Sequence, residues 1–149
     1  MKNHLVQMKL KYLVLPKFMK NEALILLAHG SRDSSWSIPF KKIEVELKEK
    51  WSFGPVRLAF FELEKPLIED VVEELRTYGQ KKFHIEPLLL ANGFHIKNDL
   101  PKRIKKLEGK YKDIFLSSGN ALIDKSNIRN SICQSIINER FTRYKNINL

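Results

Sequence analysis

One apolar run that stops abruptly at polar residues limits the possible folds of this chain more than any other feature. Residues 24–28 (LILLA) are followed at once by His29, Gly30, Ser31 and Arg32. An apolar run of this length that ends at a glycine turn is typical of a strand buried on both faces of a parallel sheet. Open α/β sheets bind ligands at the carboxyl ends of such strands, so we expect His29 and Arg32 at a binding edge.

Strand-like and helix-like segments alternate along the rest of the chain. We predict strands over about 23–29, 56–61, 82–90 and 114–116. The predicted helices run from Trp36 to Trp51, from Pro66 to Gly79, from an N-capping Asn98 or Asp99 to Gly109, and from Ile128 to Phe141, before a polar tail. Four β-α units predict the α/β class, as a four-stranded parallel sheet with helices on both faces, a flavodoxin-like half-domain. We assume the strand order 2-1-3-4.

A second stretch repeats the design of the first. The third predicted strand leads through Gly93 to His95, and the assumed order places it beside the first strand. Imidazole is the commonest transition-metal ligand and a base near pH 7, and a nearby glycine lets backbone and ligand approach closely. We therefore interpret His29 and His95 as one site. The alternative is that each ring is a strand-end residue satisfied by a backbone hydrogen bond.

Two carboxylates follow the second predicted strand. Glu62 and Glu64 stand two residues apart, so in an extended segment they would point to one side. A carboxylate beside two imidazoles would complete a site for a divalent metal. The sequence does not choose between the two glutamates, and a solvated acidic loop is the alternative. His84 and Glu86 lie further back along the third strand and are interpreted as structural, and the lysine clusters at 81–82 and 102–106 as solvated faces.

The charge of the chain is unevenly distributed. Of the net +10, half comes from five lysines within residues 1–21, which contain no acid. We predict a basic N-terminal extension over 1–21 and one domain over 22–149. The remaining domain is only moderately basic, which weakens a nucleic-acid function and suits a polyanionic small molecule.

Other features exclude several classes of protein. Cys133 is the only cysteine, so an internal disulfide and a cysteine-based zinc site are excluded, and a reducing, cytoplasmic location is expected. We predict that Cys133 is buried in the last helix. No apolar run approaches the roughly 20 residues that span a bilayer, so no membrane association is expected. Glycine-rich phosphate loops and G-x-S-x-G motifs are absent.

Three motifs, in order at the ends of the first three predicted strands, resemble the small class II chelatases. These are residues 29–33 (HGSRD), 60–66 (FFELEKP) and 87–101 (PLLLANGFHIKNDLP), the last matching the pattern P-L-h-L-x-x-G-x-H-x-x-x-D-[IL]-P, where h is apolar. The resemblance is to the stand-alone sirohydrochlorin chelatases of the cobalamin and sirohaem pathways and covers roughly residues 22–140. Residues 117–120 (SSGN) depart from the family's pattern after the fourth strand, and residues 1–21 have no counterpart.

The resemblance implies an enzyme, a lyase that inserts a divalent metal into sirohydrochlorin, a reduced tetrapyrrole rich in carboxylates. By this analogy His29 and His95 hold the metal and accept pyrrole protons, with Glu62 as their acidic partner. Substrate contacts are expected at Ser31, Arg32, Gly93 and Lys97. The resemblance implies no cofactor beyond the metal substrate, a homodimer, and Co²⁺ or Fe²⁺ as the metal, with Ni²⁺ as a third option. A non-catalytic tetrapyrrole or metal carrier on the same fold is the alternative.

Overall fold

Four parallel strands form the centre of the protein. The structure, a computed structural model, describes residues 21–147. The strands pair in the order β2-β1-β3-β4, which is the order that we assumed. Their bounds are β1 (Glu22–Ala28), β2 (Val56–Phe60), β3 (Lys82–Pro87) and β4 (Phe115–Ser118).

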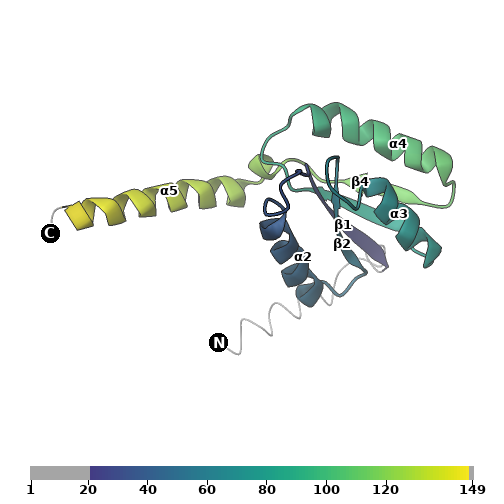
Figure 1. The fold of residues 1–149 in the computed structure, drawn as a ribbon, viewed down its shortest axis with the longest axis horizontal. Helices are drawn as coiled ribbons and strands as arrows, with labels where there is room; N and C mark the ends of the chain where they lie inside the picture. The colour runs from purple at the N-terminus through teal and green to yellow at the C-terminus, as the bar shows by residue number, and fades with distance from the viewer. Residues whose placement is uncertain (1–20, 148–149) are drawn as a thin grey trace.

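Helices cover both faces of this sheet, as predicted (Figure 1). One face packs on α2, and the opposite face packs on α3 and α4. Two short helical turns, η2 and η3, follow β3 and β4. The bounds are α2 (Ile38–Lys50), α3 (Ile68–Thr77), η2 (His95–Asp99), α4 (Leu100–Lys110), η3 (Leu122–Asp124) and α5 (Ser126–Ile147).

The central strand β1 is buried on both faces, as its unbroken apolar run predicts. Ile25 and Leu27 face α3 and α4, while Leu24 and Leu26 face α2. The inner face of α3 is the predicted set Ile68, Val71, Val72 and Leu75, all buried. Gly79 follows the C-cap of α3 with φ of 87°, the left-handed conformation expected of a glycine that ends a helix. Apolar layers therefore cover β1 on both faces.

The region after β3 differs from the prediction. The strand ends at Pro87 instead of residue 90, and a single further hydrogen bond to β1, from the Leu88 N–H to the Leu27 carbonyl oxygen at 2.8 Å, follows it. Asp99 does not cap the following helix. The residue belongs to η2, a π-helical turn that runs directly into α4, so no helix start exists at Asp99 to be capped.

The last helix contradicts the prediction most clearly. α5 extends to Ile147, none of its residues is buried, and it projects away from the rest of the domain (Figure 1). Cys133 is exposed, so the prediction that it is buried was wrong. The pattern of isoleucines identified a helix correctly, but burial requires a partner surface that this chain does not bring against α5.

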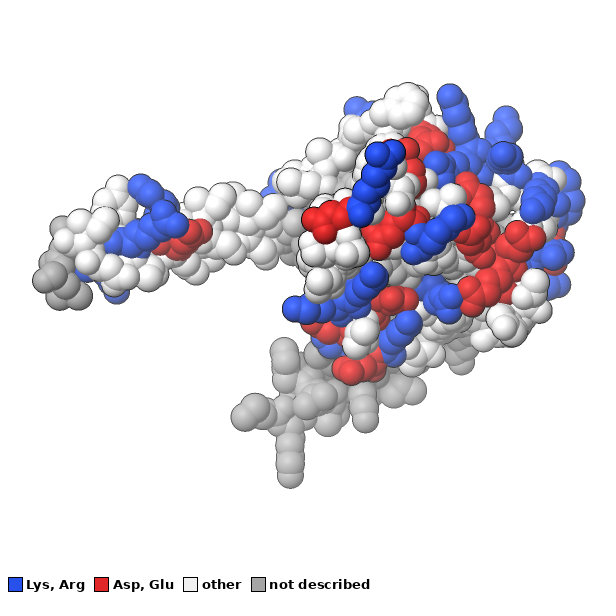
Figure 2. Space-filling model, viewed as in Figure 1, with Lys and Arg blue, Asp and Glu red and all other residues white. Residues whose placement is uncertain are grey.

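Predictions about the N-terminal extension fall on residues 1–20, outside the described part of the chain. Within residues 21–147, no helix combines the length and the apolar character needed to cross a bilayer. Positive and negative side chains are interspersed over the face of the domain shown in Figure 2, without one large basic area.

Candidate metal centre

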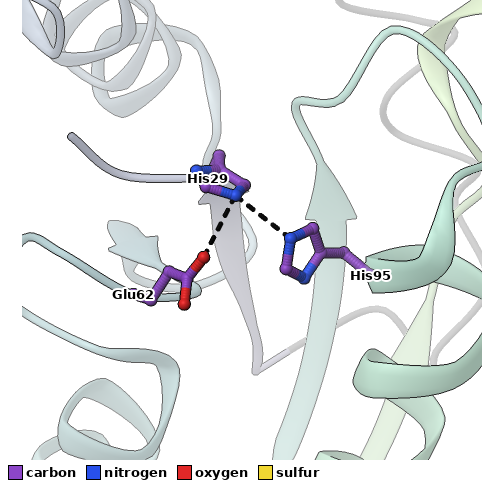
Figure 3. A group of neighbouring side chains, drawn as sticks. All are labelled: His29, Glu62 and His95. Atoms are coloured by element: carbon purple, nitrogen blue, oxygen red, sulfur yellow. Dashed lines mark hydrogen bonds and ion pairs between the residues drawn. The ribbon is translucent and has the colours of Figure 1, made fainter.

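Three side chains from separate segments of the chain converge at the carboxyl end of the sheet (Figure 3). Nε2 of His29 lies 3.1 Å from Nε2 of His95 and 3.2 Å from Oε1 of Glu62. Each residue offers one ligand atom, and these three atoms lie within 4.8 Å of one another. The geometry brings together the two histidines that the sequence assigned to one site.

His29 owes its position to the glycine that follows it. Gly30 has φ of 96°, and a Cβ atom at this position would lie 1.9 Å from the carbonyl oxygen of Glu62. The backbone N–H of Glu62 also donates to the carbonyl oxygen of His29 at 3.1 Å. The loops after β1 and β2 are therefore in direct contact, and only a glycine permits their approach.

Glu62 and Glu64 do not point to one side, contrary to the expectation for an extended segment. Leu63 between them has φ of 65°, which turns the chain out of the extended conformation. Glu62 faces His29, whereas the carboxylate of Glu64 lies 3.6 Å from Nζ of Lys41 on α2. Of the two glutamates left open by the sequence, Glu62 is the one beside the histidines.

His95 is carried by a helical turn and not by a strand end. It is the first residue of η2, and its Nδ1 lies 3.4 Å from Oδ2 of Asp99. Nε of Arg103 donates to Asp99 at 3.2 Å, and Nη1 of Arg103 donates to Glu69 on α3 at 3.4 Å. Sequence reasoning assigned Asp99 only to capping. Its spacing of four residues from His95 is the signal that could have shown the contact.

The hydrogen bonds of both rings fix which nitrogen faces the centre. Nδ1 of His29 lies 3.0 Å from the Gly30 carbonyl oxygen, an acceptor, so a neutral ring with its proton on Nδ1 can donate there and present the Nε2 lone pair to the centre. The carboxylate of Asp99 assigns the proton of neutral His95 to Nδ1 in the same way. Both Nε2 lone pairs then face each other and the Glu62 carboxylate. Three acceptors without a donor favour a cation, either a metal ion or a shared proton.

The centre is accessible from solvent. The side chains of His29, Glu62 and His95 are 37%, 50% and 31% exposed. Two imidazoles and one carboxylate suit a divalent first-row metal, and three protein ligands leave coordination positions for exchange. The arrangement is chemically suited to accept an ion, release it, and bind protons.

The other predicted site residues flank this centre. Ser31 follows Gly30, and its Oγ accepts the backbone N–H of Asp33 at 3.1 Å. Arg32 is exposed on the loop after His29, and Lys97 is exposed on η2, which also carries His95. Gly93 is exposed as well, and its carbonyl oxygen accepts the N–H of Lys97 at 3.1 Å. All four residues are close to His29 or His95 in the sequence. Within the described part of the chain, none of them forms a hydrogen bond or an ion pair with either imidazole ring.

Apolar side chains near the histidines were not identified from the sequence. The Phe61 ring lies 4.9 Å from the His95 ring, and the largely exposed Phe94 ring lies 6.3 Å from it. Leu63 and Leu90, on two of the loops at this edge, are more than half exposed. Exposed aromatic and aliphatic groups beside a polar centre are typical of sites that bind an organic ligand. In the sequence, apolar residues near a histidine look the same whether they line a binding site or lie in the core.

His84 and Glu86 lie along β3, away from the three-residue centre. Nδ1 of His84 lies 2.8 Å from Oγ of Ser117, and Glu86 pairs with His84 at 3.5 Å and with Lys125. Burial raises the pKa of Glu86, but its hydrogen bonds to His84 and Lys125 outweigh burial and hold the pKa below its usual value. These contacts fit the structural interpretation made from the sequence.

Comparison with known proteins gives one family. The family model described as CbiX matches residues 23–139. The sirohydrochlorin cobaltochelatase of Sulfolobus acidocaldarius is 33% identical over 92 residues, 62% of this chain and 73% of that protein. The enzyme of the same name from Methanococcus aeolicus is 34% identical over 87 residues, 58% of this chain. The match covers only 61% of the Methanococcus protein, about three fifths of its length.

Solved structures agree with the sequence comparison. A crystal structure of a putative cobalamin biosynthesis CbiX protein from Marinobacter aquaeolei superposes with a TM-score of 0.71 at 27% identity. It covers 82% of this chain and 98% of that one. The sirohydrochlorin chelatase SirB from Bacillus subtilis subspecies spizizenii, in complex with cobalt, gives a TM-score of 0.63 at 28% identity. That match covers 68% of this chain and 43% of SirB.

Proposed function

We propose, on the premise that this chain belongs to the CbiX family, that it inserts a divalent metal ion into sirohydrochlorin. The convergence of His29, Glu62 and His95 is the observation that carries the proposal. Relatives named sirohydrochlorin cobaltochelatase support the choice of tetrapyrrole and make Co²⁺ the first metal to test, ahead of Fe²⁺ and Ni²⁺.

The metal ion is a substrate and must be released after it binds. Two imidazoles and one carboxylate replace part of the hydration shell of the ion without enclosing it. Because the three side chains remain partly exposed, the macrocycle can approach the ion from the solvent side. Its pyrrole nitrogens then take over the coordination positions that the protein leaves open.

The same residues supply the bases that the reaction requires. Insertion of a divalent ion displaces two N–H protons from the macrocycle. Each Nε2 faces the centre with a lone pair, and Glu62 offers a carboxylate oxygen 3.2 Å from His29. Once the metal moves to the macrocycle, the imidazoles are free to take these protons, which is general-base catalysis by groups already in place.

The surroundings of the centre suit a flat, polyanionic ligand. Arg32, Lys97 and Ser31 would bind its carboxylates, and Arg can do so with two parallel hydrogen bonds. Gly93 would let the ligand approach the backbone closely. The exposed ring of Phe94 offers apolar contact to a macrocycle face.

We further propose that the protein works as a homodimer in the cytoplasm and needs no cofactor beyond the metal substrate. The domain aligns with less than half of SirB, which supports two copies doing the work of one longer chain. The single, exposed cysteine supports a reducing compartment.

Anaerobic metal insertion tests the proposal directly. Sirohydrochlorin is incubated with Co²⁺, Fe²⁺ or Ni²⁺, and the macrocycle absorbance is followed with and without protein. We expect acceleration with Co²⁺ and a loss of at least 100-fold in kcat/KM for His29→Ala and for His95→Ala, because each removes a metal ligand and a base. His84→Ala, which changes a histidine outside the centre, is the matched control and should retain activity.

The outcomes separate the enzyme from a carrier. Binding of tetrapyrrole and Co²⁺ without accelerated insertion would support a non-catalytic carrier. Wild-type rates in both histidine variants would refute the assigned site.

A further inference from the structure

A cavity of about 310 Å³ lies between α3 and α4, the two helices that cover one face of the sheet (Figure 1). Leu107, which is buried, contributes an apolar wall. The other lining residues are polar or charged, and they are Glu69, Glu73, Arg103, Lys106, Lys110 and Tyr111. None of them is one of the three candidate metal ligands. The volume is at the small end of the range for ligand pockets, so the cavity suits a small ligand.

The hydroxyl of Tyr111, a residue of the cavity wall, has no partner. Its oxygen atom is buried, yet it makes no hydrogen bond within the described part of the chain. Two cations hold the ring itself, since the Arg76 guanidinium lies 4.6 Å and Nζ of Lys110 lies 4.7 Å from its centroid. A buried tyrosine hydroxyl normally finds a hydrogen-bond partner, because leaving it without one costs stability. The hydroxyl is therefore a donor that a ligand can use.

The charged side chains of the cavity leave one positive charge over. Nη1 of Arg103 lies 3.4 Å from Oε2 of Glu69, and Nζ of Lys110 lies 3.7 Å from Oε1 of Glu73. Lys106 belongs to no ion pair within residues 21–147. Both pairs are long, and partly exposed pairs of this kind are weak, so they can rearrange around a ligand. Three cations against two carboxylates favour a ligand with a single negative charge.

Arg103 joins the cavity to the metal centre. Its Nε donates to Asp99 at 3.2 Å, and Asp99 lies 3.4 Å from Nδ1 of His95. Nη1 donates to Glu69, whereas Nη2 makes no hydrogen bond among the described residues. The guanidinium lies 5.6 Å from the centroid of the Phe61 ring, which lies 4.9 Å from the His95 ring. A ligand bound to Nη2 would therefore hold Arg103 in place without breaking its bond to Asp99.

We propose that this cavity binds a small organic carboxylate, and that the bound carboxylate tightens the binding of a divalent ion at the metal centre. The carboxylate would accept hydrogen bonds from the Tyr111 hydroxyl and from Nη2 of Arg103, and Lys106 would neutralise its charge. Hydrogen bonds to an ionised acceptor are stronger than those between neutral groups. A carboxylate carries one negative charge at neutral pH, whereas a phosphate group carries nearly two, so the carboxylate matches the charge of the lining.

Two effects give the coupling its sign. The bound anion neutralises positive charge at Arg103, which otherwise opposes the binding of a cation at the centre. An arginine that the anion holds in place also keeps Asp99 against His95, and so keeps the imidazole oriented toward the ion. By linkage, the ion must tighten the binding of the carboxylate by the same factor. The inference concerns only the binding of the metal ion and does not require that the protein be a chelatase.

Calorimetric titration of the full chain with benzoate tests the site. We expect one molecule of benzoate to bind per chain. Benzamide has the same shape without the charge and should bind about 10-fold more weakly, because it loses the charge-assisted hydrogen bonds. Inorganic phosphate is the second oxyanion. Binding of phosphate that is tighter than binding of benzoate would overturn the choice of a carboxylate.

Two variants with matched controls locate the bound benzoate. Tyr111→Phe keeps the ring and removes only the hydroxyl, and should weaken binding about 10-fold, while Lys106→Gln should weaken it about threefold. Tyr78→Phe and Lys105→Gln change exposed residues outside the cavity and should bind normally. Without benzoate, Tyr111→Phe should melt no lower than the wild type, because the hydroxyl that it loses has no partner. A purely structural hydroxyl would instead lower the Tm when removed.

Titration with Co²⁺, with and without saturating benzoate, measures the coupling. We expect Co²⁺ to bind about fivefold more tightly when benzoate is present, and this difference to vanish in Tyr111→Phe. Three results would overturn the proposal: a folded wild-type chain that does not bind benzoate, equal binding by Tyr111→Phe, or a Co²⁺ affinity that does not depend on benzoate. Because no readout uses sirohydrochlorin, a protein that shows the coupling but inserts no metal would fail only the proposed function.

Discussion

At the scale of single residues, the centre depends on a glycine as much as on its ligands. Gly30 lets the carbonyl of Glu62 lie where any other residue would place a Cβ atom, and its φ is left-handed. An alanine here must push the Glu62 loop away and adopt a strained backbone, at a cost of roughly 1–3 kcal/mol.

We therefore predict that Gly30→Ala lowers kcat/KM for metal insertion at least tenfold and weakens Co²⁺ binding, measured by titration. Gly109→Ala is the matched control, because a Cβ at Gly109 meets nothing within 4 Å. Unchanged Co²⁺ affinity in Gly30→Ala would mean that the contact between the two loops does not position Glu62.

Asp99 orients a ligand without contacting the centre. Its carboxylate lies 3.4 Å from Nδ1 of His95 and is itself held by Arg103. Such partners keep the ring in one tautomer and orientation, and their loss commonly reduces metal affinity by about 10- to 100-fold.

We predict that Asp99→Ala reduces Co²⁺ affinity by about that factor, while Asp99→Asn, which retains an acceptor oxygen, keeps most of it. Asp113→Ala removes another aspartate that pairs with an arginine, remote from the centre, and should bind Co²⁺ normally. Equal loss in the alanine and asparagine variants would indicate that charge, and not orientation, is what Asp99 contributes.

At the scale of elements, α3 is held at its start by one carboxylate. Oδ2 of Asp70 accepts hydrogen bonds from the Leu67 N–H at 2.9 Å and from Nζ of Lys65 at 2.8 Å. The Lys65 hydrogen bond, followed by that from Leu67, holds the pKa of Asp70 below its ordinary value of 3.8. The ionised form therefore stabilises the folded state.

We predict that Asp70→Ala lowers the free energy of unfolding by about 1 kcal/mol at pH 7. This is at the lower end of the usual cost of losing a helix-capping side chain, because Asp70 is exposed to solvent. Because the pKa is lowered on folding, this contribution is complete above pH of about 4 and disappears as the pH falls through the lowered pKa. Urea titrations at pH 7 and pH 3 measure the difference between wild type and variant. A difference that grows in acid would contradict the assignment.

At the scale of the whole molecule, the described part of the chain contains every residue assigned to the centre. Residues 29–103 include the three candidate metal ligands. They also include Asp99, which contacts His95, and Arg103, which holds Asp99. We predict that deletion of residues 1–18 leaves kcat/KM within twofold, because the basic extension contributes no assigned ligand. The measurement is the same insertion assay. An inactive but folded truncation would refute the interpretation of this segment as dispensable.

The sequence alone determined the α/β class, the alternation of strands and helices, and the two histidines, whereas the strand order was assumed. The unbroken apolar run of β1 demanded burial on both faces, and helical periodicities between the strands demanded a parallel sheet with crossovers. Parallel strands bring their carboxyl ends to one edge, so His29 and His95 could be assigned to one site from local patterns. The resemblance to chelatases added the chemistry and the choice of Glu62.

Only the tertiary structure decided which residues assist the histidines and where α5 lies. Glu62 and Glu64 diverge because Leu63 is left-handed, and His95 is carried by the helical turn η2 and not by the end of β3. Both depend on backbone conformations that loop sequences do not specify. The isoleucines of α5 predicted a buried face. A helical pattern of apolar residues indicates that one face of the helix is apolar, but it does not indicate which surface packs against that face. Which surface covers it depends on the direction in which the chain leaves the sheet.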